Sequence, residues 1–329
     1  MKIMKIKSIS IVVLIAWTFS VQAHEGRITV HVTDESGIAV SNAETVVQFE
    51  NILPPGEGWG SGRPTEAKGL TDTNGNCTIT ASSTGGSVSV GVRKDGYYYG
   101  NAEAIFTNGD LILNRWLPWN PTVEVLLKQK GVQAPMYARR VKEIKVPVEG
   151  KPVGFDLTAG DWVAPYGKGA TADFLFQLER KPEPEVPARE IPPYDVTLTV
   201  SFPNDGDGIQ SVFVPPQVHS GLRLPRQAPF DGYEPVLVKH RYKERGQPEH
   251  PDFREDQNYF FRVRTKKDAQ GNIVSALYGK IDGDFRGGIA GKITFTYYLN
   301  PTPNSQNMEF DPKQNLMKNL KSLEGVDAP

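Results

Sequence analysis

Short runs in which apolar and polar residues alternate recur along most of this chain of 329 residues. In residues 27–33, Ile28, Val30 and Val32 fall on one face, and Arg, Thr and His side chains fall on the other. A period of two with β-branched residues predicts a strand that buries one face. Because these runs are short and turn residues separate them, we expect an all-β protein built from sandwiches.

The composition agrees with many turns and with a weakly charged surface. The chain has 32 Gly and 26 Pro, which favour short strands joined by turns over long helices. Charged residues make up 23% of the chain and the net charge is −1. This balance gives no sign of a nucleic-acid partner or of attraction to an anionic membrane.

The N-terminus has the pattern of a secretory signal peptide. Residues 1–7 are basic, residues 9–19 are almost entirely apolar, and Val21 and Ala23 are small residues that favour cleavage after Ala23. A membrane anchor is the alternative, but it needs about 20 apolar residues. We therefore expect residues 1–23 to be removed, no membrane span, and an exported protein that is periplasmic or extracellular.

Cys77 is the only cysteine, so the chain cannot form an internal disulfide. The fold must then depend on its apolar core. Cys77 follows the polar stretch Asp72-Thr73-Asn74-Gly75-Asn76, in which Asp can bond its own backbone and Asn-Gly tolerates positive φ. We interpret this stretch as a hairpin turn and Cys77 as a small strand residue.

Three motifs in the N-terminal third carry a family resemblance. They are V-T-D-E-S-G at 32–37, T-D-T-N-G at 71–75 and K-D-G-Y at 94–97. In this order they resemble the carboxypeptidase regulatory-like domain, a prealbumin-like or Cna-B-type β-sandwich, over residues 26–99. The resemblance implies an Ig-like sandwich that acts as a rigid module for binding, spacing or stabilisation.

Two domains are expected after the signal peptide. The first covers residues 24–130 and ends in a Trp/Pro extension, whose Trp116 and Trp119 we expect to pack between the domains. The second, residues 131–304, is a larger β-sandwich with the jelly roll as a candidate topology, and the Pro-rich segment 181–193 forms a long loop inside it. Residues 305–329 are expected to be a polar tail with a short helix at 314–323. The expected strands of the second domain are 153–157, 171–178, 196–202, 210–214, 235–242, 259–265, 273–281 and 292–299.

Exposed aromatic residues are the first candidate ligand site. Trp59 stands in a Gly-rich loop, and Tyr97, Tyr98 and Tyr99 follow one another at the end of a strand, so that Tyr98 faces opposite its neighbours. Exposed aromatic rings on a β-sandwich can stack on sugar rings. The alternative is that these residues belong to the core or to a domain interface.

Two further groups have the chemistry of metal ligands. Asp205 and Asp207 stand in Asn-Asp-Gly-Asp-Gly, which resembles part of a calcium loop but equally suits a simple turn. Cleavage after Ala23 would leave His24 with a free amine and an imidazole, which together can bind copper if a second histidine approaches. Without such a histidine, His24 is only the start of a strand.

A basic stretch at 241–245 is close in sequence to Glu249 and Asp252. We interpret it as a solvated surface of mixed charge. The chain contains no G-x-S-x-G, H-E-x-x-H or phosphate-loop motif, and we assign no catalytic residue and no cofactor.

The expected function is therefore an exported, non-catalytic binding or scaffolding protein whose partner is a protein or polysaccharide at the cell surface. A carbohydrate-binding accessory protein is the first alternative. The second is a metal-dependent secreted enzyme that uses His24 or the Asp205 loop.

Overall fold

The structure, a computed structural model, describes residues 22–53, 62–181, 192–214 and 220–329. The chain divides into two compact units. The first takes the described residues up to Thr33 together with 38–92 and 101–125, and the second takes 34–37, 93–100 and 126–329. The described residues form strands and turns without a helix, which confirms the all-β class. Accordingly, none of them belongs to a helix that could cross a membrane.

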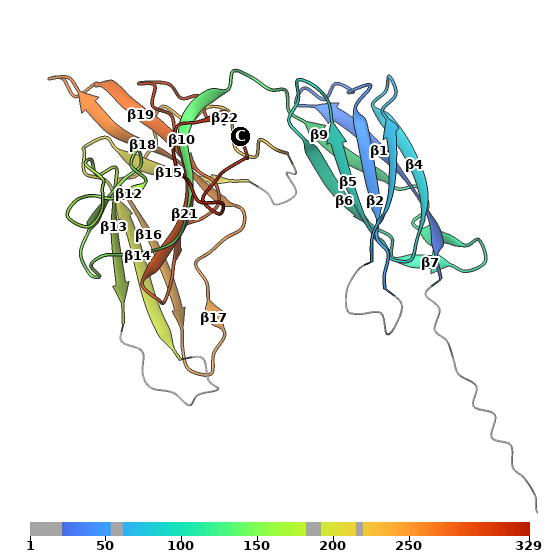
Figure 1. The fold of residues 1–329 in the computed structure, drawn as a ribbon, viewed down its shortest axis with the longest axis horizontal. Helices are drawn as coiled ribbons and strands as arrows, with labels where there is room; N and C mark the ends of the chain where they lie inside the picture. Colours follow the sequence, from blue (N-terminus) through green and yellow to red (C-terminus); the bar gives the residue numbers. More distant parts are fainter. Residues whose placement is uncertain (1–21, 54–61, 182–191, 215–219) are drawn as a thin grey trace, which may run out of the picture. The chain divides into compact units, whose positions relative to one another are not determined.

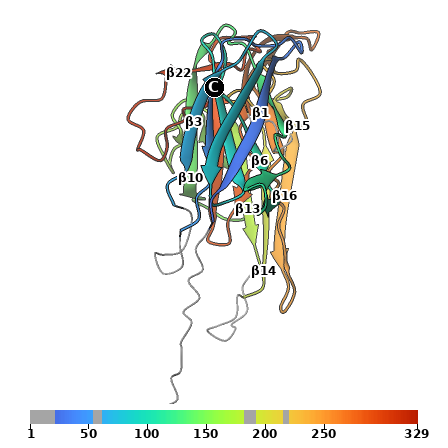
Figure 2. The same ribbon diagram turned by 90° about the vertical axis from the view of Figure 1, so that its right-hand side faces the viewer.

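The first unit is a sandwich of two sheets. One sheet has the order β4 (Asn76–Ser83), β1 (His24–Asp34), β8 (Arg115–Leu117) and β7 (Asn108–Asp110), and β9 (Thr122–Leu127) also pairs with β1. The other has the order β3 (Thr65–Leu70), β2 (Glu44–Phe49), β5 (Ser87–Arg93) and β6 (Gly100–Ile105). The axes of β1, β3 and β6 are roughly aligned in Figure 2, as in an aligned sandwich.

The alternation predicted for β1 is confirmed, because Ile28, Val30 and Val32 are fully buried. Val30 lies opposite Cys77 of β4, which is also buried. The turn before Cys77 is held by Asp72 Oδ1, which accepts the backbone N–H of Asn74 at 2.9 Å and that of Asn76 at 2.8 Å. This turn joins β3 and β4, which belong to different sheets, so the expectation of a hairpin was wrong.

The second unit contains two larger sheets (Figure 1). The six-stranded sheet has the order β12 (Asp161–Trp162), β11 (Val153–Asp156), β13 (Phe174–Arg180), β14 (Tyr194–Ser201), β16 (Val236–Lys243) and β17 (Glu249–His250). The seven-stranded sheet has the order β15 (Gly208–Phe213), β18 (Gln257–Lys267), β19 (Ile273–Ile281), β21 (Lys292–Leu299), β10 (Ala134–Lys145) and β22 (Phe310–Asn315), and β20 (Arg286–Gly287) pairs with β21.

A cluster of aromatic rings forms the core between these sheets. Phe155, Phe174 and Phe176 come from the six-stranded sheet, and Phe261 and Phe295 come from the other. Most of these rings meet edge to face; those of Phe174 and Phe261, for example, have centroids 5.0 Å apart. Such contacts add to the hydrophobic stabilisation from burial, and they join the two sheets without a covalent link.

Each of the eight strands expected in the second domain overlaps an observed strand, and the bounds of β19 and β21 are those expected. The paired strands β13 and β14 flank the Pro-rich segment, so it connects neighbours within one sheet. The helix expected at 314–323 was wrong. Residues 310–315 form β22, which pairs with β10, and Phe310 and Val326 are buried. Residues 305–329 therefore belong to the second unit and are not a separate polar tail.

Candidate functional site

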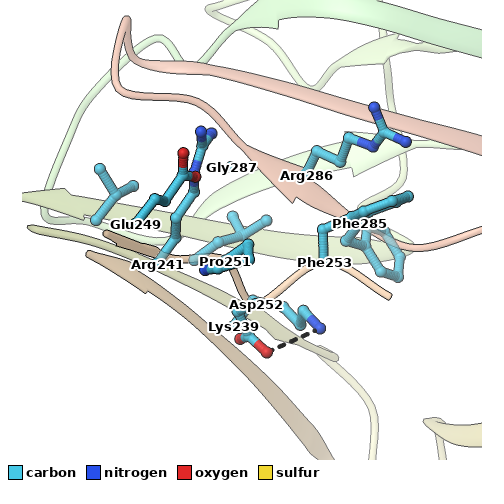
Figure 3. A pocket seen from close by; sticks show the side chains of 11 residues that line it. Lys239, Arg241, Glu249, Pro251, Asp252, Phe253, Phe285, Arg286 and Gly287 are labelled. Atoms are coloured by element: carbon cyan, nitrogen blue, oxygen red, sulfur yellow. Dashed lines mark hydrogen bonds and ion pairs between the residues drawn. The ribbon is translucent and has the colours of Figure 1, made fainter. Parts of the chain in front are cut away.

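A pocket of about 220 Å³ opens in the second unit, beside β16 and β17 of one sheet and β20 of the other. Its lining comes from segments that are far apart in the sequence. The lining residues are Val196, Leu198, Lys239, Arg241, Glu249, Pro251, Asp252, Phe253, Phe285, Arg286 and Gly287. Figure 3 shows Arg286, Phe253 and Phe285 grouped on one side of the pocket and Arg241 beside Glu249 on the other.

The apolar wall of the pocket is continuous with the core. Val196 and Leu198 are inward-facing residues of β14, and Phe285 packs on Tyr259 and Phe295. The missing side chain of Gly287 allows the β20 backbone to lie close to β14, because a methyl group there would be 3.2 Å from Leu198 Cβ. The floor of the pocket is therefore fixed by packing.

Most of the lining charges are held in ion pairs. Lys239 Nζ lies 2.9 Å from Asp284 Oδ2 and 3.2 Å from Asp252 Oδ1. The Arg241 guanidinium bonds the carboxylate of Glu249 on the neighbouring strand β17. This contact holds the pKa of the Glu249 carboxyl below its ordinary value, so Glu249 stays ionised at neutral pH.

Arg286 differs from the other lining cations. Its guanidinium carbon lies 3.7 Å from the centroid of the Phe253 ring, and its side chain is exposed at the rim of the pocket. Among the described residues, no carboxylate forms an ion pair with it. The stacking restricts the plane of the guanidinium while its N–H donors remain available. The pocket thus combines apolar walls with one uncommitted cation.

The predicted tyrosine surface is divided by the fold. Tyr98 is buried, Tyr97 is half-buried, and Tyr99 is exposed. The three residues lie in the connection between β5 and β6 and not at the end of a strand as expected. The Tyr98 ring is buried, so it is not available for stacking on a ligand. Trp59 lies outside the described residues. The tyrosines do not form one continuous aromatic face.

The two aspartates of the predicted calcium loop bond protein donors. Asp207 is buried, and its carboxylate accepts the backbone N–H of Thr265 at 2.8 Å and that of Arg264 at 3.1 Å. Asp205 lies 2.7 Å from Lys267 Nζ. In the part of the chain that the structure describes, no three His, Cys, Asp or Glu side chains gather as a metal group would. Asp207 therefore joins the loop that contains Asp205 to strand β18 through hydrogen bonds.

His24 is buried inside β1, where its ring meets the edge of Trp116 at a centroid distance of 5.1 Å. His31 stands an odd number of residues away on the same strand, so it faces the opposite side and bonds Glu124 at 2.7 Å. The two histidines of β1 therefore do not converge. Trp116 also stacks on Phe106, so it packs within the first unit and not between domains as expected.

The sequence analysis did not identify the pocket residues as a site. The charges at 241–245, with Glu249 and Asp252, were interpreted as a solvated mixed surface, whereas Arg241, Glu249 and Asp252 line the pocket. The only signals available in the sequence were the residue types of Phe253 and Arg286, an aromatic residue and an arginine. They are 33 positions apart in the sequence, and only the fold brings them together.

Comparisons with known proteins identify no family for this chain. No protein-family model matches it, and no curated protein matches it. A solved structure that does match is the 3-chlorocatechol 1,2-dioxygenase of Rhodococcus opacus 1CP, with 13% identity and a TM-score of 0.23. The match covers 32% of this chain and 60% of that one. A likeness at this level carries no argument about function.

Proposed function

We propose that this chain is an exported, non-catalytic binding protein, and that the pocket of the second unit holds a small anionic ligand with an apolar body. The observation that carries the proposal is the position of Arg286 over Phe253 at the rim of an apolar pocket. Export is the expectation from residues 1–23. The partner class expected from the sequence, a protein or polysaccharide at the cell surface, could present such a group.

Arg286 suits a carboxylate ligand. A guanidinium can donate two parallel N–H bonds to one carboxylate, and such charge-assisted bonds are stronger than neutral ones. Because Phe253 already supports the guanidinium, binding would order few additional side-chain torsions. The apolar body of the ligand would lie against Val196, Leu198 and Phe285.

The remaining charges are held in ion pairs, and Glu249 is not suited to act as a general acid. A general acid must carry a proton near neutral pH, whereas the contact with Arg241 lowers the pKa of Glu249. Lys239 is held between Asp252 and Asp284. These groups therefore supply a fixed electrostatic lining. The volume of about 220 Å³ suits a small molecule or a single group of a larger partner.

The first unit would act as a rigid module that carries or spaces the binding unit. This role is what its resemblance to carboxypeptidase regulatory-like domains implies. Its two sheets, and β1 with one face buried between them, are compatible with such a module. The carbohydrate-binding alternative has less support, because Tyr98 is buried.

The test uses phenylacetate and its neutral analogue phenylacetamide as probes in saturation-transfer NMR with the whole chain. We expect a stronger signal from phenylacetate, and we expect Phe253→Ala to abolish it. Phe213→Ala is the matched control, because Phe213 also lies under an arginine, Arg254 at 5.0 Å, but does not line the pocket. Equal signals from the two probes, or an unchanged signal in Phe253→Ala, would refute the proposal.

A further inference from the structure

The hairpin formed by β7 and β8 in the first unit ends in three consecutive exposed aliphatic residues. Leu111 is 72% exposed, Ile112 is 94% exposed and Leu113 is 56% exposed. Single exposed apolar residues are common on protein surfaces, whereas runs of three or more are unfavourable unless something covers them. We therefore expect a partner to cover the exposed aliphatic side chains of this hairpin tip.

The backbone of the tip is held in one conformation. Asp110 Oδ1 accepts the backbone N–H of Ile112 and that of Leu113, both at 3.0 Å. Asn114 closes the turn with a φ of 49°, and its carbonyl accepts the backbone N–H of Glu25 at 3.0 Å. Asn and Asp are the residues that suit these two positions. The three side chains are thus presented by an ordered turn.

An aromatic residue and two cations stand behind the tip. Arg115 follows the tip directly, and its guanidinium carbon is 5.3 Å from the centroid of the Trp119 ring. Arg27 lies on the same ring at 6.0 Å. Aliphatic side chains followed by Trp and Arg match the order of groups at a membrane–water interface, from the acyl chains to the headgroups.

The tip lies at the point where the N-terminal segment enters the fold. Gln22 Nε2 is 3.4 Å from Asn114 Oδ1, and Glu25 of β1 pairs with Arg115 of β8. Figure 1 shows β7 at the end of the first unit where β1 begins. The tip therefore lies beside the start of β1, where residues 22–25 enter the fold.

We propose that the β7–β8 tip docks the protein on a lipid bilayer surface. Leu111, Ile112 and Leu113 enter the outer acyl region, and Trp119 with Arg27 and Arg115 lies at the level of the headgroups. This surface is independent of the pocket and goes beyond the proposed binding function. Insertion of aliphatic side chains drives the contact, so zwitterionic lipid suffices. Anionic lipid strengthens it through Arg27, because the Arg115 guanidinium already lies 4.0 Å from the Asp110 carboxylate.

The test is co-sedimentation of the chain that begins at His24 with phosphatidylcholine vesicles, with and without phosphatidylglycerol. We expect binding to both, and we expect the triple variant L111S/I112S/L113S to reduce the partition coefficient at least about tenfold, since burial of one such side chain is worth that much. Leu70→Ser is the matched control, because Leu70 of β3 is 63% exposed and outside the tip. It should bind as the wild type does.

A second readout places the tip in the bilayer. Ile112→Cys can be labelled with an environment-sensitive fluorophore while Cys77 stays buried and unlabelled. Vesicles should shift its emission to the blue. Vesicle binding that the triple variant retains, or no binding by the wild type, would overturn the proposal. If the wild type instead formed a dimer that the triple variant lost, the tip would be a protein contact and the lipid proposal would also fall.

Discussion

Lys239 donates to the fully buried carboxylate of Asp284 across 2.9 Å. Lys239 belongs to β16 of the six-stranded sheet, and Asp284 stands between β19 and β20 of the other sheet. The pair therefore bridges the two sheets of the second unit beside the pocket. Asp284 also accepts the hydroxyl of Tyr259 at 2.7 Å and the backbone N–H of Arg254 at 3.1 Å. One carboxylate thus fixes donors from three segments.

Asp284→Ala should destabilise the second unit by about 3–5 kcal/mol, because it leaves Lys239 and the Tyr259 hydroxyl without their buried acceptor. Urea denaturation measures the free energy of unfolding. Asp205→Ala is the control, since Asp205 pairs with Lys267 while its side chain is 90% exposed, and it should cost less than about 1 kcal/mol. Similar losses in the two variants would contradict a structural role for Asp284.

Because Lys280 of β19 is buried, we expect the free energy of unfolding to have an unusual dependence on pH. Burial lowers the pKa of Lys280 from 10.5 to about 8, and its ammonium lies 4.6 Å from the Tyr298 ring centroid. Between about pH 8 and the ordinary lysine pKa, the unfolded chain therefore binds a proton that the folded chain does not. Stability should rise with pH in this window, by up to about 1.4 kcal/mol per pH unit.

Urea denaturation of the wild type and of Lys280→Met at several pH values isolates this effect. The difference in unfolding free energy between the two proteins should change by about 2 kcal/mol from about pH 8 to about pH 10, in favour of the wild type. Below the folded pKa the difference should stay constant, because both states are then protonated. A constant difference across the whole range would show that the Lys280 pKa is not lowered by burial.

Gly69 and Cys77 are coupled in the first unit. A methyl group on Gly69 would lie 2.6 Å from Cys77 Sγ, closer than two such atoms can approach. Gly69→Ala should therefore cost about 1–3 kcal/mol of unfolding free energy. In a Cys77→Ala background the same change should cost at least about 1 kcal/mol less. A double-mutant cycle by urea denaturation checks this, and additive effects would contradict the close contact.

The alternation of side chains predicted much of the fold. In β14, Val196, Leu198 and Val200 are buried as the period of two required, and β19 and β21 begin and end where the sequence indicated. The sheet order could not be predicted, because pairing depends on contacts between distant segments. The error at 314–323 has a related cause. Local propensity favoured a helix, whereas residues 310–315, which overlap this range, form a strand that pairs with β10.

The candidate site was less accessible to prediction from the sequence. Tyr97, Tyr98 and Tyr99 were selected because they are consecutive, but in the connection between β5 and β6 Tyr98 is buried and Tyr99 is exposed. The guanidinium carbon of Arg286 lies 3.7 Å from the centroid of the Phe253 ring, and no local sequence pattern predicts this contact. The sequence shows that Arg241 and Glu249 have opposite charges and are eight positions apart. Their pairing on adjacent strands is seen only in the structure.

The most direct test of the proposed function is isothermal titration of phenylacetate into the wild type, Arg286→Gln and Arg254→Gln. Arg254 is the matched arginine, since it also lies over a phenylalanine but is paired with Asp256 and does not line the pocket. We predict that Arg286→Gln weakens binding at least about tenfold, as expected for the loss of a charge-assisted bond, and that Arg254→Gln binds as the wild type does. The same Kd in all three proteins would contradict the assignment of this pocket as an anion-binding site.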